Sequence, residues 1–191
     1  GTMFRSAIMN DIIAKHPMDG VRYTKPVRAV DDIHFLTREE QAIFLETAKR
    51  SHNYRQYVLL LETGLRTSEL IGLTWDSIDW KKHALTINKT LEYRHKNKCW
   101  RAGPPKTEKS YRTIPLTDRA YAVLKSCYDE RDSRKESDTL SQVLEYMDRR
   151  TGRTGTLVMK DLVFINYRTG EPAKNSSYDT HLYKLCDEAG I

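Results

Sequence analysis

Arg66 is a charged residue between two apolar segments, where a guanidinium could take part in phosphate chemistry. Gly64 predicts the end of one helix, and Thr67 or Ser68 could cap the next, so Arg66 falls in a turn between two helices. Glu69 follows three residues later and could turn back to orient the guanidinium. A guanidinium fixed in this way is a planar donor that matches two phosphate oxygens. The alternative is a purely structural ion pair between Arg66 and Glu69.

A basic tract between residues 81 and 112 is the second feature with chemical potential. It contains ten Lys or Arg residues and two acids, whereas the whole chain has a net charge of +6. The rest of the chain is therefore close to neutral. Positive charge concentrated on one segment is typical of a surface that binds a polyanion. The alternative is a lysine-rich hairpin that is simply solvated.

Lys106 is the candidate proton donor in this tract. Arg101, Lys109 and Arg112 are its basic neighbours in the sequence, and nearby like charges lower the pKa of a lysine, which eases proton donation. Lys109 competes for the same role, and either lysine could instead make a simple phosphate contact. We expect no metal or cofactor, because the six histidines and three cysteines lack the spacing of metal ligands.

Helices must position most of these residues. Apolar spacing predicts a first helix after Met3 that ends at His16-Pro17, because a proline disfavours the helical conformation of the residue before it. Thr37-Arg-Glu-Glu40 has the pattern of a capping box and predicts a helix to about Lys49. A further helix is expected over about 53–63.

A small antiparallel hairpin must carry the basic tract. Alternating apolar residues predict one strand over 85–91 and another over 111–116. The basic residues 94–105 between them predict a hairpin or a three-strand meander with a positively charged tip. Residues 131–160 are predicted to form a surface insertion with a short helix near 140–147. The pattern as a whole favours a mixed α+β fold that is mainly helical.

Composition limits the class of protein. Hydrophobic residues make up 39% and charged residues 30% of the 191 residues, which is typical of a folded globular protein. No apolar run is as long as the ~20 residues that a membrane-spanning helix needs. The three widely spaced cysteines favour free thiols in a reducing compartment. We therefore expect a cytoplasmic protein.

Two sequence blocks resemble one known family. Gly64-Leu-Arg-x-x-Glu-Leu-x-x-Leu-x-Trp-x-x-Ile-Asp79 resembles the first arginine motif of the tyrosine recombinases, the phage integrase family. Gly103-Pro-Pro-Lys-Thr-Glu-Lys-Ser-Tyr-Arg-Thr-Ile-Pro-Leu116 resembles the hairpin that presents the family's catalytic lysine. The resemblance covers about Phe35 to Ile191, and integrases of bacterial conjugative transposons and phages are the most similar.

The resemblance implies a site-specific recombinase that breaks and rejoins double-stranded DNA through a 3′-phosphotyrosine intermediate. Arg66 would be the first catalytic arginine, Lys106 rather than Lys109 the general acid, and Glu69 a supporting residue. Other recombinase protomers in a synaptic complex would be partners, and the protein would act at the bacterial nucleoid. Further basic residues are assigned to contacts with the DNA backbone, which raise affinity without distinguishing sequences: Lys89, Arg94, Lys96, Lys98, Arg101, Lys109 and Arg112.

The resemblance also implies three segments: residues 1–21 as the last helix of a DNA-clamping domain, 22–34 as a basic linker, and 35–191 as the first part of the catalytic domain. The family pattern continues with a His-x-x-Arg motif and a tyrosine nucleophile, which residues 1–191 lack. His52-x-x-Arg55 precedes Arg66, which is the wrong order. We therefore expect these residues alone to bind DNA without cleaving it.

Two other functions stay open. One is a DNA-binding module without catalytic activity on the same scaffold. The other is a metal-dependent nuclease, which would need several acids beside Lys106, where Glu108 is the only nearby one. A His-x-x-Arg motif and a tyrosine in a longer gene product would favour the recombinase.

Overall fold

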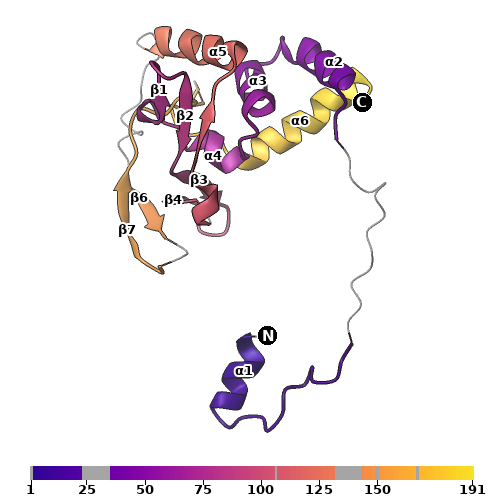
Figure 1. The fold of residues 1–191 in the computed structure, drawn as a ribbon, viewed down its shortest axis with the longest axis vertical. Coiled ribbons are helices and arrows are strands. Elements are labelled where there is room, and N and C mark those ends of the chain that lie inside the picture. Colours follow the sequence, from indigo (N-terminus) through magenta and orange to yellow (C-terminus); the bar gives the residue numbers. More distant parts are fainter. Residues whose placement is uncertain (1, 23–34, 106, 132–142, 149–150, 167) are drawn as a thin grey trace. The chain divides into compact units, whose positions relative to one another are not determined.

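The computed structural model describes residues 2–22, 35–105, 107–131, 143–148, 151–166 and 168–191 (Figure 1). The chain divides into two compact units, Gly1–Phe35 and Leu36–Ile191. No helix in the described residues is long and apolar enough to cross a membrane. The predicted linker over 22–34 lies almost entirely outside the described residues, so the division into three segments stays a prediction.

The first unit contains a helix that is shorter than predicted. Helix α1 spans Thr2–Met9 and ends well before His16-Pro17. Asp11 has a φ of 54°, which is incompatible with a continuing helix. None of the residues of α1 is buried, so no packing offsets the cost of extending so short a helix. The proline was therefore not the residue that ended it.

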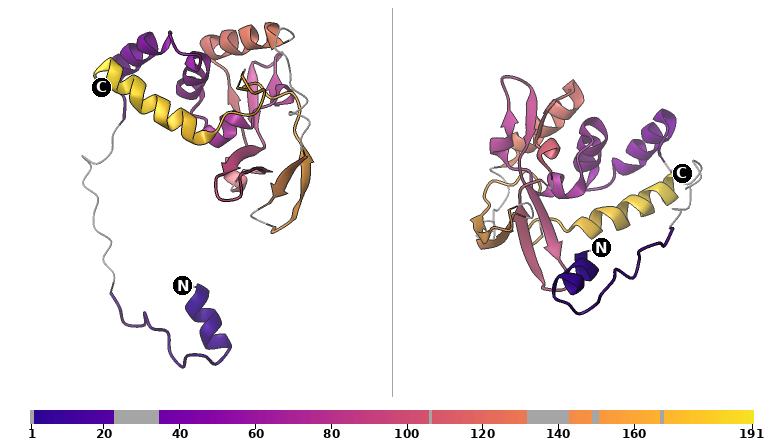
Figure 2. Two further views of the ribbon diagram at one scale, coloured as in Figure 1. Left: turned by 180° about the vertical axis from the view of Figure 1, so that it is seen from behind. Right: turned by 60° about the horizontal axis from the view of Figure 1, so that its bottom comes forward.

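Five helices form much of the second unit as described. They are α2 (Arg38–Ala48), α3 (Tyr54–Thr63), α4 (Thr67–Ile71), α5 (Asp118–Asp129) and α6 (Asn175–Ala189). The predicted capping box is confirmed, because Thr37 Oγ1 accepts from the Glu40 amide at 3.2 Å and the Glu40 carboxylate accepts from the Thr37 amide at 2.7 Å. Helix α2 packs on α6 and α3 on α5, and Figure 2 shows α6 in yellow beside α2 in both views.

The strands form two small sheets. The first has the antiparallel order β1 (Ile78–Asp79), β2 (Ala84–Ile87) and β5 (Arg112–Pro115). The second has the order β3-β4-β6-β7, with bounds Thr90–Arg94, Cys99–Gly103, Val143–Met147 and Thr154–Val158. Its β3–β4 pair is a hairpin formed largely by residues 94–105, which the sequence predicted only as the basic tip between the strands 85–91 and 111–116, and its β4–β6 pair is parallel.

The single strand predicted over 85–91 is two strands that belong to different sheets. The chain leaves β2 after Ile87 and enters β3 at Thr90. Leu85, Ile87 and Leu91 are all buried, so the alternation of apolar residues continues across the break. The alternation therefore identified the strand residues correctly but could not reveal that the pairing partner changes.

A glycine allows helix α4 to lie directly against β3. A Cβ atom at Gly72 would be 2.9 Å from the amide nitrogen of Leu91 and 3.1 Å from the carbonyl carbon of Thr90. Both atoms belong to the backbone, so no side chain could move away, and only glycine fits this close approach. This contact holds α4, the helix that follows Arg66, against β3, the first strand of the β3–β4 hairpin.

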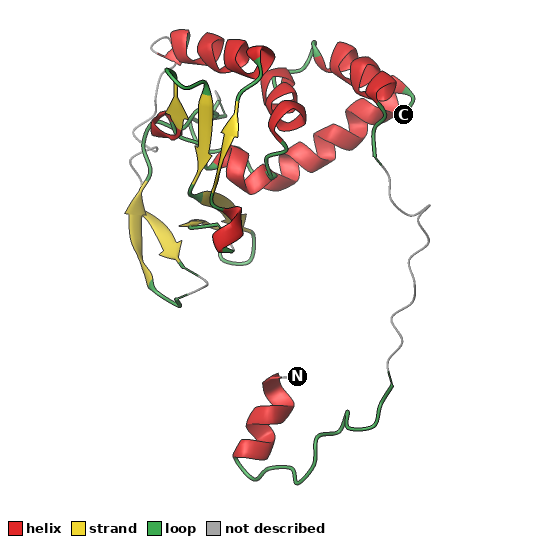
Figure 3. Cartoon of the chain, viewed as in Figure 1, coloured by secondary structure: helices red, strands yellow, loops and turns green. Residues whose placement is uncertain are grey.

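The insertion after α5 contains strands where a helix was predicted. Residues 143–147 form β6, which pairs with β4 on one side and with β7 on the other (Figure 3). Gly103 makes this close pairing possible, because a Cβ atom there would lie 2.4 Å from the Met147 carbonyl oxygen. With this change, the predicted mixed α+β fold is confirmed.

Candidate functional site

Arg66 lies in the turn between α3 and α4, as predicted. Helix α3 ends at Gly64, whose φ of 63° is in the left-handed region and whose amide donates to the Leu60 carbonyl at 2.9 Å. Neither Thr67 nor Ser68 caps α4; the residue that precedes the helix is Arg66 itself, with extended backbone angles. The Glu69 carboxylate takes the role of the cap, because it accepts from the Arg66 amide at 2.9 Å.

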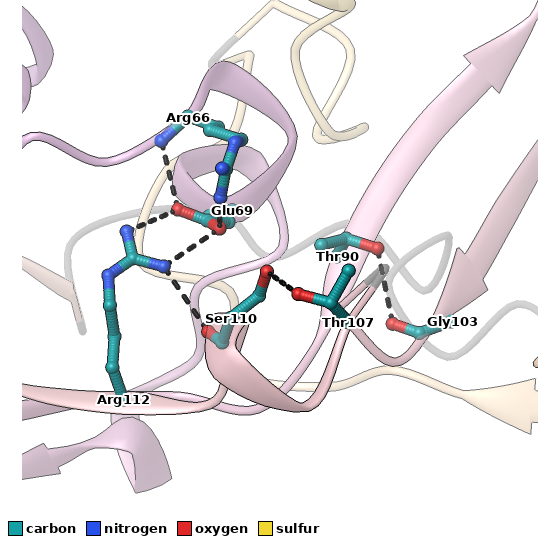
Figure 4. A network of polar contacts seen from close by, with 7 residues as sticks. All are labelled: Arg66, Glu69, Thr90, Gly103, Thr107, Ser110 and Arg112. Atoms are coloured by element: carbon teal, nitrogen blue, oxygen red, sulfur yellow. Dashed lines mark hydrogen bonds and ion pairs between the residues drawn. The ribbon is translucent and has the colours of Figure 1, made fainter. Parts of the chain in front are cut away.

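Glu69 connects two arginines (Figure 4). Its side chain is 1% exposed. Glu69 Oε1 accepts from Arg66 Nη1 at 2.9 Å and from Arg112 Nη1 at 3.0 Å. Glu69 Oε2 accepts from Arg112 Nη2 at 2.8 Å in addition to the Arg66 amide. A carboxylate offers about four lone-pair sites, so these contacts fill its accepting capacity.

The electrostatic balance at Glu69 favours the ionised carboxylate. Burial alone would raise its pKa, because a low-dielectric site disfavours charge. The hydrogen bonds from Arg112 and Arg66 outweigh burial and hold the pKa of Glu69 below its ordinary value. The same contact raises the pKa of Arg112. The acid is therefore charged at neutral pH and holds both guanidinium groups.

The Arg66 side chain borders a pocket of about 410 Å³. The Arg66 side chain is 67% exposed, although its partner Glu69 is buried. One wall of the pocket comes from the turn and α4, and another from β3, β4 and the segment after them. The lining residues that matter here are Arg66, Ser68, Glu69, Thr90, Pro105 and Thr107. The turn and the end of the hairpin thus share one concave surface.

Lys106 lies outside the described residues, so its predicted role stays a prediction. Pro105 and Thr107, its neighbours in the sequence, both line the pocket that Arg66 borders. Thr107 Oγ1 and Ser110 Oγ lie 2.8 Å apart, within hydrogen-bonding distance. The described chain on both sides of position 106 therefore reaches the candidate site.

Several of the predicted DNA-binding residues have partners within the protein. Arg101 is buried on β4 and pairs with Glu92, the residue directly opposite on β3; its Nε donates to Glu92 Oε1 at 2.8 Å. Arg94 Nη1 lies 3.4 Å from the same oxygen. Lys89 Nζ lies 3.0 Å from Asp76 Oδ1, with its side chain 22% exposed. These ion pairs reduce the charge that the three residues can offer to a ligand.

Other predicted DNA-binding residues are exposed. Lys96 and Lys98 lie in the turn between β3 and β4, and Lys109 lies in the short 3₁₀ helix Glu108–Ser110. Lys98 has a φ of 52°, which the tight turn requires. Arg112 differs from these lysines, since its side chain is 29% exposed and it contacts Glu69. The sequence predicts the same DNA contact for Lys96, Lys98 and Arg112, whereas their environments differ.

In the described residues, no histidine or tyrosine lines the pocket that Arg66 borders. The rings of His52 and His181 stack with centroids 5.6 Å apart, and His52 and Tyr178 line a different pocket from that of Arg66. Tyr178 is buried, whereas Tyr183 is exposed. In the part of the chain that the structure describes, no group of three or more His, Cys, Asp or Glu side chains could hold a metal ion.

Comparison with known proteins identifies relatives of this chain. The model of the phage integrase family matches residues 34–191. The transposase of transposon Tn916 from Enterococcus faecalis is 33% identical over 149 residues, which are 74% of this chain and 36% of the transposase. The prophage integrase IntR of Escherichia coli K12 is 27% identical over 154 residues, 80% of this chain and 34% of IntR. The chain thus spans about a third of these curated relatives.

Solved structures share the fold. The Tn1549 transposon integrase in complex with a circular intermediate DNA has a TM-score of 0.71 at 22% identity, over 99% of this chain and 55% of that one. The lambda integrase bound to DNA has a TM-score of 0.52 at 16% identity, over 100% of this chain and 54% of that one. The family match over residues 34–191 shows that the chain belongs to the phage integrase family, the tyrosine recombinases.

Proposed function

We propose that this chain supplies the phosphate-activating part of a site-specific DNA recombinase that integrates or excises a mobile element. The observation that carries the proposal is the arrangement of Arg66: an exposed guanidinium held by a buried, ionised glutamate at the edge of a pocket. A group oriented in advance in this way costs little reorganisation when negative charge develops on a phosphate. This arrangement favours a catalytic arginine over a purely structural ion pair.

The proposed chemistry is a transesterification. Arg66 stabilises the charge on the equatorial oxygens of the pentacoordinate phosphorane. A tyrosine hydroxyl from outside residues 1–191 loses its proton to solvent as it attacks the phosphorus, forms a 3′-phosphotyrosine and displaces the 5′ oxygen of the next nucleotide. Lys106 gives that oxygen a proton, which leaves a free 5′ hydroxyl. Attack by the 5′ hydroxyl of another strand reverses the step and joins the DNA, so no cofactor is consumed.

The proposed partners are double-stranded DNA and further recombinase protomers. Exposed lysines of the hairpin turn, Lys96 and Lys98, contact the DNA backbone and contribute affinity for any sequence. The related structures support this part of the proposal: the Tn1549 and lambda integrases were solved in complex with DNA, and lambda integrase also as a tetramer bound to a Holliday junction.

A DNA-binding module without catalytic activity is the second candidate. One observation favours it: in the described residues, no tyrosine lines the pocket that Arg66 borders. This candidate predicts that Arg66 matters no more than any other surface arginine. The two candidates therefore differ in the effect of a single substitution.

The test is Arg66→Ala in a protein that also contains the His-x-x-Arg and tyrosine motifs. A nicked duplex with the recombination site traps the covalent protein–DNA complex, which is quantified by gel electrophoresis. We expect the rate of its formation to fall by about 10²–10³-fold or more, the loss typical of a preorganised donor to a transition state, while DNA affinity changes little. Arg119→Ala, which removes an exposed arginine on α5, is the control. A covalent complex formed at the unaltered rate by Arg66→Ala would refute the proposed role.

A further inference from the structure

Arg112 is bound on several sides by the protein itself. Its Nη1 donates to Glu69 Oε1 at 3.0 Å and lies 3.2 Å from the Ser110 carbonyl oxygen, and its Nη2 donates to Glu69 Oε2 at 2.8 Å. The two contacts to Glu69 form the bidentate pair that a guanidinium makes best with a carboxylate. Arg112 does not border the pocket, whereas Arg66 does. Reaching a phosphate there would require Arg112 to give up its pair with a buried acid.

Arg112 and Arg66 divide the Glu69 carboxylate between them. Each oxygen accepts one bond from Arg112 and one from Arg66, through the Arg66 side chain on Oε1 and the Arg66 amide on Oε2. Removal of Arg112 would leave one unfilled site on each oxygen of a buried carboxylate. The carboxylate would then gain by rotating toward other donors, which weakens its contact with the Arg66 guanidinium. Arg66 would then be less fixed relative to the pocket.

Arg112 also links two parts of the chain that are far apart in the sequence. It is the first residue of β5, directly after the segment 107–111, and Glu69 lies on α4. Thr107, at the other end of that segment, lines the Arg66 pocket. The Glu69–Arg112 pair therefore connects the chain that follows Lys106 to the turn that holds Arg66.

From these contacts we infer that Arg112 is a positioning residue of the recombinase: it acts through Glu69 to fix Arg66 for phosphate binding and does not itself bind DNA. The inference replaces the backbone contact that the sequence predicts for Arg112. It rests on the proposed function for its purpose, because Arg66 needs a fixed orientation only if it binds a phosphate. The geometry of the contact is independent of that function.

The test uses these 191 residues labelled with ¹⁵N-arginine and inorganic phosphate as the probe. Nuclear magnetic resonance follows the Nε–Hε signal of each arginine during a phosphate titration, and relaxation gives the order parameter of the Arg66 side chain without phosphate. In the unaltered protein, we expect phosphate to shift the Arg66 signal and to leave the Arg112 signal in place. In Arg112→Met, the Arg66 order parameter should fall and the phosphate concentration at the midpoint should rise about tenfold.

Two further variants keep the test decisive. Arg112→Lys retains the charge but cannot make a two-pronged contact, so it should also loosen Arg66, and it provides the measurement if Arg112→Met does not fold. Arg119→Met, which removes an arginine 3.7 Å from Glu62, is the control for loss of charge and should leave Arg66 unchanged.

Three results have distinct meanings. An Arg112 signal that follows phosphate as strongly as that of Arg66 would overturn the inference, because Arg112 would then be a direct ligand. An Arg66 order parameter and midpoint that are the same in Arg112→Met, Arg112→Lys and Arg119→Met would overturn it as well. If phosphate leaves Arg66 unaffected in the unaltered protein, the proposed phosphate role of Arg66 fails, while the order parameters still decide whether Arg112 positions it.

Discussion

The arginine turn and the tip of the basic hairpin use positive charge in opposite ways. In the turn, Arg66 and Arg112 converge on Glu69, whose side chain is 1% exposed. At the tip, Lys96 and Lys98 are exposed between β3 and β4. Charges held by a buried acid have a fixed direction, whereas exposed lysines keep their mobility and act through long-range attraction. The first arrangement suits catalysis and the second suits binding to a backbone of any sequence.

The ion pair of Arg101 and Glu92 lies in the hairpin but resembles the arginine turn, because a partner within the protein holds the charge of Arg101. Arg101 is buried and faces Glu92 across the strand pair. Its charge therefore serves the packing of the second sheet, where its Nη1 also contacts the Met147 sulfur at 3.2 Å. The basic character of a segment thus overstates the charge available to a polyanion, because part of the positive charge is neutralised within the protein.

Replacing Glu69 by alanine should have the largest effect, and it tests whether this buried acid holds the two arginines of the turn. The change leaves Arg66 and Arg112 without their acid and opens a cavity at a buried position. Since the arginines can still reach water, we expect a loss of about 3 kcal/mol in the free energy of unfolding, the lower end of the range for breaking a buried pair. Urea denaturation followed by circular dichroism measures it.

The matched control is Glu188→Ala, which removes an exposed acid that lies 3.6 Å from Lys184 on α6. It should change the free energy of unfolding very little, as is usual for surface pairs. Equal losses in the two variants would mean that the Glu69 network is no more than a surface ion pair.

Charge reversal at Lys96 and Lys98 would test whether the exposed lysines of the hairpin tip bind a phosphate backbone. We expect the double variant to bind duplexes of unrelated sequence about tenfold more weakly and to unfold at an unaltered urea concentration. The slope of log affinity against log salt should flatten by about 0.9 for each lost phosphate contact. Fluorescence anisotropy at several salt concentrations measures both quantities. Reversal of Lys125 and Lys184, on α5 and α6, is the control with the same change of charge, and an equal loss there would show that only net charge matters.

The smallest expected effect is on stability at low pH, and it tests whether Glu69 is ionised in the folded protein. Its pKa in the folded protein lies below the ordinary value of 4.5, because the hydrogen bonds from Arg112 and Arg66 outweigh burial. Its ionisation therefore stabilises the fold fully above about pH 4.5, and this contribution is lost as the pH falls through the folded-state pKa. Glu69→Gln should be less stable at pH 7 and should lose less stability on acidification between pH 5 and 3 than the unaltered protein. Parallel acid profiles would show that Glu69 does not titrate below its ordinary pKa.

Local patterns in the sequence determined the parts of this protein that depend on neighbouring residues. The capping box of Thr37 and Glu40, the Thr117 cap of α5, and the turn around Arg66 all follow from contacts within a few positions. The two sequence blocks over residues 64–79 and 103–116 also identified the family from the residues alone. Such signals survive in the sequence because both partners of each interaction lie close together in the chain.

Tertiary structure alone decided the features that need distant partners. Residues 143–147 form a strand because β4 and β7 offer it edges, and the strand predicted over 85–91 divides because its two halves pair with β5 and β4. Arg112 is bound by Glu69, 43 positions away, and nothing in the local sequence distinguishes it from the exposed lysines. The physical reason is the same in each case: apolar alternation and positive charge are local properties, but a strand partner or a buried counterion is supplied by a segment that only folding brings near.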